Sequence, residues 1–460
     1  MRVFDSRLAY TLAVLALLPW ALVHLLWRAR GQPEYLRHWG ERFGCAGAAD
    51  VQDPPVPTIW LHAVSVGETR AAQPLVAALR ERYPGHRILF THTTPTGRAT
   101  SEALFGARVE RIYLPYDTPW AMRRFLRQYQ PQFGLIMETE LWPNLIEACR
   151  QADIPLLLVN ARMSQRSARR YAKFPVLTRE ALQGLAAIGA QSAVDATRLE
   201  ALGAHRVTVT GNIKFDIAAP PQQLELGREL RKGYGNRPVW LAASTRDGEE
   251  ALILEAWQRG KPGVEAGSTC LPEAPPDDPQ GGAYPPGRGQ AAALLVIVPR
   301  HPQRFNEVAR LAAERGFSVQ RRSDNAPIAS TTQVLIGDSM GEMFAFHAST
   351  DLAFIGGSLL DFGSQNLIEA AACGTPILIG PSTRNFAEAA REAIACGAAL
   401  SIRDADDLVS QANALLSNPD RRRQMSAAGR AFTERHRGAT ERTLALVVAA
   451  TPPIQRPLPS

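Results

Sequence analysis

Short apolar runs alternate with amphipathic stretches along most of this chain. A first series of apolar runs covers residues 58–65, 87–94, 112–116, 133–138, 156–162, 186–191 and 206–216. A second series covers residues 238–245, 294–302, 317–323, 334–338, 352–358 and 376–380. Strands that alternate with helices at this rhythm form parallel sheets with helices on both faces. The pattern therefore predicts an α/β protein with two doubly wound domains.

Changes in composition mark the domain boundaries. Pro220 and Pro221 lie in a break between the two series, which we interpret as a hinge. We expect a membrane anchor, a first domain, a second domain and a loose tail, at residues 1–30, 31–217, 218–450 and 451–460. Residues 260–290 are rich in Pro, Gly and Ala, which predicts a disordered surface insertion. Helical periodicity over residues 406–450 directs four residues inward: Leu408, Leu415, Met425 and Phe432.

A long apolar stretch lies near the start of the chain. Residues 8–27 contain no Asp, Glu, Lys or Arg and are about long enough to cross the ~30 Å hydrocarbon core of a bilayer as a helix. Pro19 and His24 weaken that interpretation, and a helix lying in the membrane interface is the alternative. No small-residue cleavage site follows, so a cleaved signal peptide is disfavoured. Either reading predicts attachment to a membrane.

Flanking arginines give this segment an orientation. Arg28, Arg30 and Arg37 follow it, whereas Arg2 and Arg7 precede it. Because positive charge is enriched on the cytoplasmic side of membrane segments, the body of the protein is expected in the cytoplasm.

The overall composition describes an ordinary globular protein. At 460 residues, with 45% hydrophobic and 21% charged residues, the chain is long enough for two hydrophobic cores. Its five cysteines lie far apart and show no metal-ligand spacing. This pattern indicates a reducing compartment and no structural zinc.

The net charge of +7 is concentrated in one region. Residues 162–179 contain a basic group: Arg162, Arg166, Arg169, Arg170, Lys173 and Arg179. An anionic surface or ligand could face this group, and a solvated helix face is the alternative. No recognised nucleic-acid motif accompanies it, so we do not expect a nucleic-acid partner.

Polar residues follow several strands of the first series. Carboxyl ends of parallel strands share one edge of a sheet, where such sheets bind ligands. Glu68 begins a helix there and is either a general base for a hydroxyl or a complement to the helix dipole. Glu138 and Glu140 follow another strand, and strand alternation would allow only one of them to point into the site. Lys214 could neutralise charge on a leaving phosphate, or it could be a surface lysine.

The second series has comparable strand ends. Arg300 and His301 follow a hydrophobic strand, where an arginine suits bidentate binding of phosphate or carboxylate. Gly341-Glu342 and Gly363-Ser-Gln-Asn366 are expected to open helices whose free N–H groups could bind an anion. Glu369 follows Asn366 by three residues, so it either closes a capping box or binds sugar hydroxyls.

Several familiar motifs are missing from the sequence. We find no Walker motif, no GxGxxG after a first strand and no DxD-like acidic pair in a loop. Transfer from a phosphate-activated sugar without a metal remains open.

A series of longer motifs occurs in one order along the chain. They are His62-Ala-Val-Ser-Val-Gly-Glu68, Thr94-Pro-Thr-Gly97, Tyr113-Leu-Pro-Tyr-Asp117, Met137-Glu-Thr-Glu-Leu-Trp-Pro-Asn144, Asn160-Ala-Arg162, Gly211-Asn-Ile-Lys-Phe-Asp216, Val298-Pro-Arg-His-Pro302, Gly337-Asp-Ser-Met-Gly-Glu342 and Phe354-Ile-Gly-Gly-Ser358. Together they resemble the Kdo transferases of lipid A biosynthesis, from about Tyr35 to the C-terminal helices.

The resemblance implies a fold, an activity and a set of site residues. The fold is GT-B, with two Rossmann-like domains facing a central cleft. The activity is transfer of Kdo (3-deoxy-D-manno-octulosonic acid) from CMP-Kdo to lipid IVA at the cytoplasmic face of the cell inner membrane, without a metal or a further cofactor. Glu68 would be the proton acceptor, with Glu138 and Lys214 assisting at the transition state. The implied contacts to CMP are Pro299, Arg300, Met340, Gly341, Glu342, Asn366, Leu367, Ile368 and Glu369.

Two features depart from the family pattern. The usual His-Asn-Pro before the donor-site Glu is Gln365-Asn366-Leu367 here, which predicts altered donor affinity without loss of function. The insertion at residues 260–290 has no counterpart in that pattern, and its place away from the motif loops makes it tolerable.

The sequence therefore leads to one hypothesis and two rivals. In the hypothesis, an inverting, metal-independent transfer begins when Glu68 accepts a proton from the sugar hydroxyl of the lipid. One rival is a GT-B transferase or epimerase that uses a UDP-sugar, and the other is a membrane-bound protein that binds CMP-Kdo without catalysis.

Overall fold

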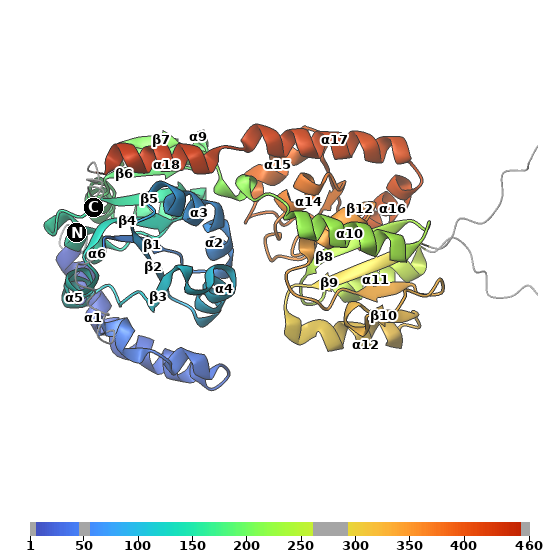
Figure 1. Cartoon of the computed structure of the whole chain (residues 1–460), viewed down its shortest axis with the longest axis horizontal. Coiled ribbons are helices and arrows are strands. Elements are labelled where there is room, and N and C mark those ends of the chain that lie inside the picture. The colour runs from blue at the N-terminus through green and yellow to red at the C-terminus, as the bar shows by residue number, and fades with distance from the viewer. Residues whose placement is uncertain (1–5, 46–55, 261–292, 452–460) are drawn as a thin grey trace, which may run out of the picture. The chain divides into compact units, whose positions relative to one another are not determined.

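The structure is a computed structural model that describes residues 6–45, 56–260 and 293–451. The chain folds into two compact units, Met1–Ile217 with His436–Ser460, and Ala218–Arg435 (Figure 1). Each unit contains one parallel sheet of seven strands. Nearly all of the predicted insertion and of the predicted tail lies outside the described residues.

The strands and helices have the following bounds. The first unit contains strands β1(Thr58–His62), β2(Arg87–His92), β3(Glu110–Tyr113), β4(Pro131–Met137), β5(Leu156–Ala161), β6(Ala187–Ala190) and β7(Val207–Val209). Its helices are α1(Arg7–Ala29), η2(Pro33–Leu36), η3(Trp39–Phe43), α2(Val66–Ala71), α3(Gln73–Arg82), α4(Pro95–Phe105), η4(Gly106–Arg108), α5(Pro119–Tyr129), α6(Pro143–Gln151), α7(Gln165–Tyr171), α8(Pro175–Gln183), α9(Ala193–Ala201), η5(Ile213–Asp216) and α18(Ala439–Ala450).

The second unit is built in the same way. Its strands are β8(Val239–Thr245), β9(Leu294–Pro299), β10(Val319–Arg321), β11(Val334–Ile336), β12(Leu352–Ile355), β13(Ile377–Ile379) and β14(Ala399–Ser401). Its helices are α10(Pro221–Tyr234), α11(Glu249–Arg259), η6(Pro302–Arg304), α12(Phe305–Glu314), η7(Arg322–Asp324), α13(Met343–Ser349), α14(Ile368–Cys373), α15(Ala387–Ala395), α16(Ala405–Leu416) and α17(Pro419–His436).

The first sheet has the strand order β3-β2-β1-β4-β5-β6-β7 and is covered on both faces. Alternate residues of β1 show how this arises, since Ile59 and Leu61 pack with one hydrophobic cluster and Trp60 packs with the other. The Trp60 ring requires a glycine opposite it, because a Cβ at Gly134 of β4 would lie 2.5 Å from a carbon of that ring. The chain order reverses between β1 and β4, which makes their carboxyl ends the switch point of this sheet.

The second sheet has the order β10-β11-β9-β8-β12-β13-β14 and is likewise buried on both faces. Strands β9 and β12 flank the first strand, β8, so the switch point lies at the carboxyl end of β8. The last strand, β14, is short and was not predicted from the sequence. The four residues predicted to point inward from the C-terminal helices are all buried, which confirms their helical periodicity.

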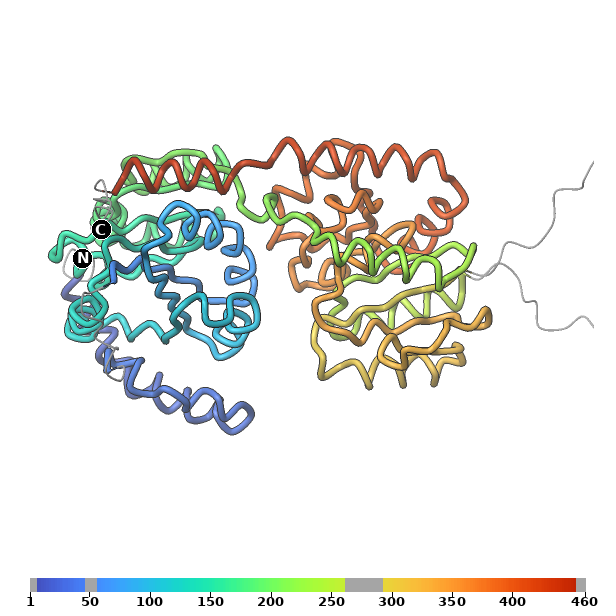
Figure 2. The backbone as a smooth tube through the Cα atoms, in the orientation of Figure 1, coloured from blue at the N-terminus to red at the C-terminus, as the bar shows by residue number. Residues whose placement is uncertain are grey.

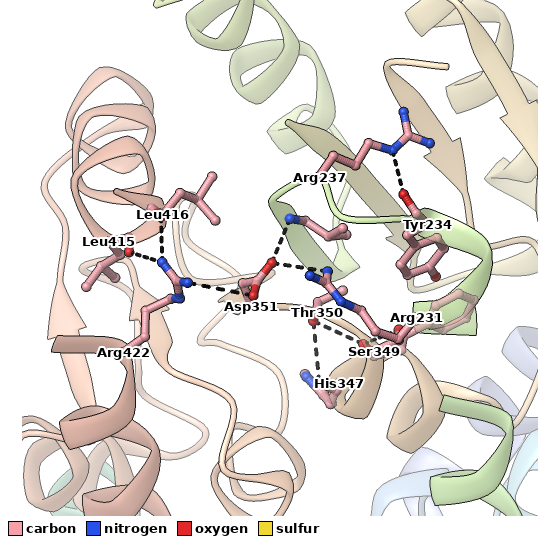
Figure 3. A network of polar contacts seen from close by, with 12 residues as sticks. Arg231, Tyr234, Arg237, His347, Ser349, Thr350, Asp351, Leu415, Leu416 and Arg422 are labelled. Carbon is pink, nitrogen blue, oxygen red and sulfur yellow. Dashed lines mark hydrogen bonds and ion pairs between the residues drawn. The ribbon is translucent and has the colours of Figure 1, made fainter. Parts of the chain in front are cut away.

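A polar network holds the opposite, amino-terminal edge of this second sheet (Figure 3). Asp351 precedes β12 and accepts a hydrogen bond from the backbone N–H of Val239 at 2.8 Å. Its carboxylate also pairs with Arg231 of α10 at 3.2 Å and with Arg422 of α17 at 4.0 Å. One carboxylate therefore joins two helices to the start of the central strand.

The end of the chain corrects the predicted domain boundary. Residues 218–450 were expected to form the second domain, yet the chain from His436 onward belongs to the first unit. Helix α18 packs against α3 and β6, and Figure 1 shows it alongside the first sheet. Asp216 fixes its start, because the Asp216 carboxylate accepts hydrogen bonds from the N–H groups of Gly438 and Thr440. Hydrophobic periodicity predicted this helix but could not show which core it would cover.

Candidate functional site

Glu68 lies at the switch point of the first sheet, in the first turn of α2. Glu68 is buried, with 8% of its surface exposed. One carboxylate oxygen accepts the Val64 N–H at 2.8 Å and the other accepts the Ser65 hydroxyl at 2.8 Å. Ser65 also caps the helix by accepting the N–H of Glu68 at 3.3 Å. The Ser65-Val-Gly-Glu68 sequence thus folds the carboxylate back over the end of β1.

The surroundings of Glu68 raise its pKa to about 7. Burial is the main cause, because a low-dielectric environment disfavours the charged form, and the negative charge of Glu138 adds to it. The Val64 N–H, the Ser65 hydroxyl and the positive charge of Lys214 act in the opposite direction. A carboxylate with a pKa near neutrality is suited to accept a proton and later release it.

Glu138 and Lys214 form an ion pair beside Glu68. The Lys214 Nζ lies 2.8 Å from a carboxylate oxygen of Glu138, and both side chains are mostly buried. The loop that carries Lys214 is fixed by two asparagines: Asn212 accepts the Lys214 N–H, and Asn160 accepts the Ile213 N–H. The structure therefore brings Glu68, Glu138 and Lys214 into one group of interacting charges.

Glu140 interacts with the same group, and the expectation from regular strand alternation does not apply to its segment. Strand β4 ends at Met137, and Glu138 adopts a left-handed backbone conformation with φ 61°. Alternation therefore no longer applies after Met137. Burial, followed by the charges of Glu68 and Glu138, raises the pKa of Glu140 to about 7. Glu138 therefore acts on both Glu68 and Glu140, and Glu68 acts on Glu140.

In the second unit, a basic group lies at the carboxyl ends of β8 and β9. Arg300 follows β9 and donates from its Nε to the side-chain oxygen of Gln365 at 3.1 Å. His301 contacts Arg246, with their nitrogens 3.1 Å apart, and the Arg246 guanidinium lies over the Phe362 ring, 4.6 Å from its centroid. Burial and the charges of Arg246, Arg300 and Arg304 lower the pKa of His301, which disfavours its protonated form. This positive field would favour a bound anion.

Glu249 holds the loop that follows β12 in place. Its carboxylate is fully buried and accepts hydrogen bonds from the N–H groups of Gly357 at 2.7 Å and Leu359 at 3.0 Å. It also accepts the N–H of Arg246 at 2.8 Å, which fixes the loop after β8. Gly356 permits this close packing, since a Cβ there would lie 2.5 Å from the Ser244 carbonyl oxygen.

The segment before α13 carries three of the predicted donor contacts. Met340 is exposed, and Gly341 has a left-handed backbone with φ 83°. The Glu342 carboxylate accepts the Ser339 hydroxyl at 2.6 Å and pairs with Arg322 at 3.2 Å. Helix α13 begins at Met343, directly after Gly341-Glu342, as predicted. Glu342 is thus held at the helix start by two partners from its own unit.

The segment before α14 differs from the predicted capping box. The helix begins at Ile368, and the Asn366 side chain accepts the Ile368 N–H at 3.0 Å. Its amide nitrogen donates to the Glu369 carboxylate at 3.0 Å. Leu367 and Ile368 are buried, so their side chains are not presented to a ligand.

Gln365 has a defined role in this unit. It occupies the position of the histidine expected from the family pattern, and its carbonyl oxygen accepts the hydrogen bond from Arg300. The Gln365 N–H is bonded to the Gly356 carbonyl oxygen at 2.9 Å. The substitution therefore preserves a polar partner that orients Arg300.

Sequence reasoning did not name Arg246 or Glu249. Both belong to Ser244-Thr-Arg-Asp-Gly-Glu-Glu250, directly after the first strand of the second sheet. The rule that polar residues after a parallel strand face the ligand-binding edge would have found Arg246. The same rule would not have found the role of Glu249, because two of its hydrogen-bond donors, the N–H groups of Gly357 and Leu359, are about a hundred residues away in the chain.

Comparison with known proteins agrees with this architecture. Two solved structures share the fold: a glycosyltransferase from Rickettsia africae, at a TM-score of 0.55 and 14% identity, and a UDP-GlcNAc 2-epimerase from Neisseria meningitidis, at 0.54 and 13%. The first match covers 86% of this chain and 98% of the other, and the second covers 85% and 100%. Two doubly wound sheets of this kind define the GT-B class of proteins.

Sequence relatives narrow the class to one family. The family described as 3-Deoxy-D-manno-octulosonic-acid transferase (kdotransferase) matches residues 37–217, and a glycosyl transferase-like family matches residues 340–447. A 3-deoxy-D-manno-octulosonic acid transferase of Bordetella pertussis is 45% identical over 95% of this chain and 98% of its own length. The Haemophilus influenzae transferase is 36% identical over 96% of this chain and 98% of its own length. The chain belongs to the 3-deoxy-D-manno-octulosonic acid (Kdo) transferases, which are glycosyltransferases.

Proposed function

We propose that the chain transfers Kdo from CMP-Kdo to the sugar hydroxyl of lipid IVA in lipopolysaccharide biosynthesis. The observation that carries the proposal is Glu68, a buried carboxylate whose pKa is raised to about 7 beside the Glu138–Lys214 ion pair. Family membership supplies the sugar that is transferred. The donor, the acceptor and the roles of individual residues are parts of the proposal.

In the proposed reaction, Glu68 accepts the proton of the acceptor hydroxyl. The acceptor oxygen then forms a bond to the anomeric carbon of Kdo as the bond from that carbon to the phosphate oxygen breaks, and CMP leaves with the electron pair. Attack from the face opposite CMP inverts the configuration at that carbon. Lys214, paired with Glu138, supplies positive charge that stabilises the developing negative charge, and no metal ion is required.

The second unit is proposed to hold the donor. CMP-Kdo carries a phosphate and a carboxylate, and the positive charges of Arg246 and Arg300 suit such an anion. Pro299, Met340, Gly341, Glu342, Asn366, Leu367, Ile368 and Glu369 complete the proposed donor site.

Attachment to the cytoplasmic face of the inner membrane completes the proposal. Helix α1 is long and apolar enough to enter a membrane, and only 6% of its most apolar part is buried inside the protein. The exposed basic side chains of α7 and α8 add a surface suited to the phosphates of the acceptor or of lipids.

The deciding experiment follows radiolabel from CMP-Kdo into a lipid IVA fraction. The wild-type chain should produce labelled lipid, and Glu68→Gln should lower kcat by roughly 10²–10⁴-fold, since a general base contributes about that much. Glu102→Gln is the matched control, because Glu102 is an exposed carboxylate on the neighbouring helix α4.

Each alternative has its own outcome in this assay. Normal turnover by a folded Glu68→Gln variant would show that another group accepts the proton. Inhibition by UDP but not by CMP would favour a UDP-sugar donor. Saturable binding of CMP-Kdo without any labelled product would indicate a binding protein.

A further inference from the structure

Helix α1 is fastened to the body of the first unit at its beginning. The Tyr10 hydroxyl donates to the Asp117 carboxylate at 2.9 Å, and the Thr11 hydroxyl donates to the side-chain oxygen of Asn144 at 2.9 Å. Arg7 adds an ion pair to Glu147 at 2.9 Å. Asp117 is buried and also accepts the N–H groups of Asn144 and Leu145, so it is an integral part of the body.

The segment that follows α1 returns to the same place. Tyr35 packs against Leu25 and Ala29 near the end of the helix, so residues 30–36 double back along it. Figure 2 shows α1, in dark blue, extending away from the sheet of the first unit. The return ends in η3, where the carbonyl oxygen of Arg42 accepts the Tyr116 N–H at 2.9 Å.

The two attachment points are therefore consecutive residues. Tyr116 binds the returning segment, and Asp117 binds the first turn of the helix. Glu41 reinforces the return by accepting the Tyr113 N–H at 2.7 Å. A helix of 23 residues is roughly 34 Å long, so it leaves the body and its connection comes back over a similar distance.

This geometry is incompatible with a simple membrane-spanning helix. If α1 crossed a bilayer, its two ends would lie on opposite sides, and residues 30–41 would have to cross back. That return segment contains Arg30, Glu34, Arg37 and His38, all of which are exposed. Charged side chains are strongly disfavoured in the hydrocarbon core, so such a crossing is excluded.

The exposed surface of α1 nevertheless requires an apolar partner. Large apolar side chains are exposed along it: Leu8, Leu12, Leu15, Leu17, Trp20, Val23, Leu26 and Trp27. The helix contains no acidic residue, and Arg28 and Arg30 lie exposed at its end. On α5, exposed Trp120 stacks against Phe43 of the return segment and adds to the apolar surface. Tryptophan and arginine beside a broad apolar face are typical of a helix in a membrane interface.

We infer that α1 and its return segment form a hairpin lying in one leaflet of an anionic lipid bilayer, with both ends on the side of the membrane that holds the body. The apolar side chains enter the acyl region and the arginines contact lipid phosphates. This inference rests on the membrane attachment proposed above, whose mode it specifies. The hairpin would hold the first unit close to the surface from which a lipid acceptor must be drawn.

A topology experiment on the full chain tests the inference. An epitope fused to the N-terminus is followed in sealed vesicles of both orientations, with protease added outside. Where the body is digested, the epitope should be lost as well, and where the body is protected, the epitope should remain. An epitope that is protected while the body is digested would overturn the hairpin and establish a spanning helix.

Tryptophan quenching provides a second measurement. Trp20→Phe and Trp27→Phe variants are bound to vesicles of phosphatidylethanolamine and phosphatidylglycerol brominated at shallow or deep acyl positions. In the hairpin, Trp20 and Trp27 should both be quenched better by shallow bromine. Preferential quenching of Trp20 by deep bromine and of Trp27 by shallow bromine would contradict it, because a spanning helix places Trp20 nearer the bilayer centre.

Failure of the broader proposal would look different. If the full chain does not sediment with these vesicles, membrane attachment itself is wrong. If it sediments but the epitope is protected opposite the body, only the hairpin is wrong. Leu12→Lys with Val23→Lys should reduce vesicle binding at least tenfold, whereas Gln183→Lys, on the exposed surface of α8, should not.

Discussion

At the residue scale, three acidic side chains show how neighbours determine chemistry. Glu68, Glu138 and Glu140 have the same ionisable group, yet their surroundings in the folded protein differ. Glu138 is paired with Lys214, whereas buried Glu68 and half-buried Glu140 have pKa values raised to about 7. The pair keeps one negative charge fixed next to a carboxyl group that can titrate near neutral pH. This arrangement suits the proposed roles, in which Glu68 accepts a proton and Glu138 stays negatively charged beside it.

The pH dependence of activity should report this interaction. Glu68 must be ionised to accept a proton, so kcat/KM should fall about tenfold per pH unit below about pH 7. In Glu138→Gln, loss of the neighbouring negative charge lowers the pKa of Glu68, and the acid limb should move to lower pH. A pH profile of kcat/KM for both proteins measures the shift. An unchanged limb in a variant with reduced rate would show that Glu68 is not the titrating group.

At the scale of elements, buried carboxylates fix the loops at the edge of the second sheet. Glu249 at the start of α11 binds backbone N–H groups of the loops after β8 and β12. Asp351 has a comparable role at the other edge, where it joins α10 and α17 to β8. Substitution of Glu249 should affect both loop geometry and stability, whereas substitution of Asp351 should affect stability alone.

Glu249→Gln should weaken both stability and donor use. The amide has one acceptor oxygen in place of two, and its NH₂ group would face backbone donors, at a cost of about 1–3 kcal/mol of unfolding free energy. We expect a lower Tm and a several-fold higher KM for CMP-Kdo, measured by calorimetry and steady-state kinetics. Glu255→Gln on the exposed face of α11 is the control. A normal KM would mean that the loop after β12 does not contact the donor.

Asp351→Asn should lower stability without changing donor affinity. The amide weakens the bonds to Arg231, Arg422 and the Val239 N–H, which should cost about 1–3 kcal/mol in denaturant unfolding of the second unit. Asp351 lies at the amino edge of the sheet, so KM should stay within about twofold of wild type. Asp420→Asn is the control, since Asp420 is exposed on α17. A raised KM with unchanged stability would contradict the structural role.

At the scale of the whole molecule, the last helix belongs to the first unit. Helix α18 buries Ala439, Thr443 and Val447 against the core that contains α3 and β1. The first unit is therefore completed only when the end of the chain has been synthesised. This long-range contact makes the stability of the first unit depend on the chain's final residues.

Truncation after Arg437 should destabilise the first unit. It exposes the hydrophobic face covered by α18 and removes the backbone partners of Asp216. We expect a loss of several kcal/mol of unfolding free energy and rapid proteolysis within residues 56–217. Truncation after Thr451, which leaves α18 intact, should have little effect. Equal protease resistance of the two truncated proteins would show that α18 is dispensable for folding.

The sequence determined the features that depend on local order. Apolar runs and their spacing predicted two parallel-sheet units, because a strand buried on both faces must be apolar along its whole length. Motifs after those strands identified Glu68, Glu138 and Lys214, because chain order alone places the carboxyl ends of parallel strands at one edge. The apolar stretch at residues 8–27 was also evident as a helix, because its length and composition are local features.

Only the tertiary structure decided the features that depend on contacts between distant residues. The raised pKa values of Glu68 and Glu140 follow from burial and from charges on another strand, and the left-handed Glu138 that brings them together has no signal in strand periodicity. The attachment of α1 at Asp117 and the return of α18 to the first sheet join residues more than a hundred positions apart. Local sequence determines which helices and strands form. Burial and contacts between distant residues determine which of these elements pack together and how far the pKa values of their side chains are shifted.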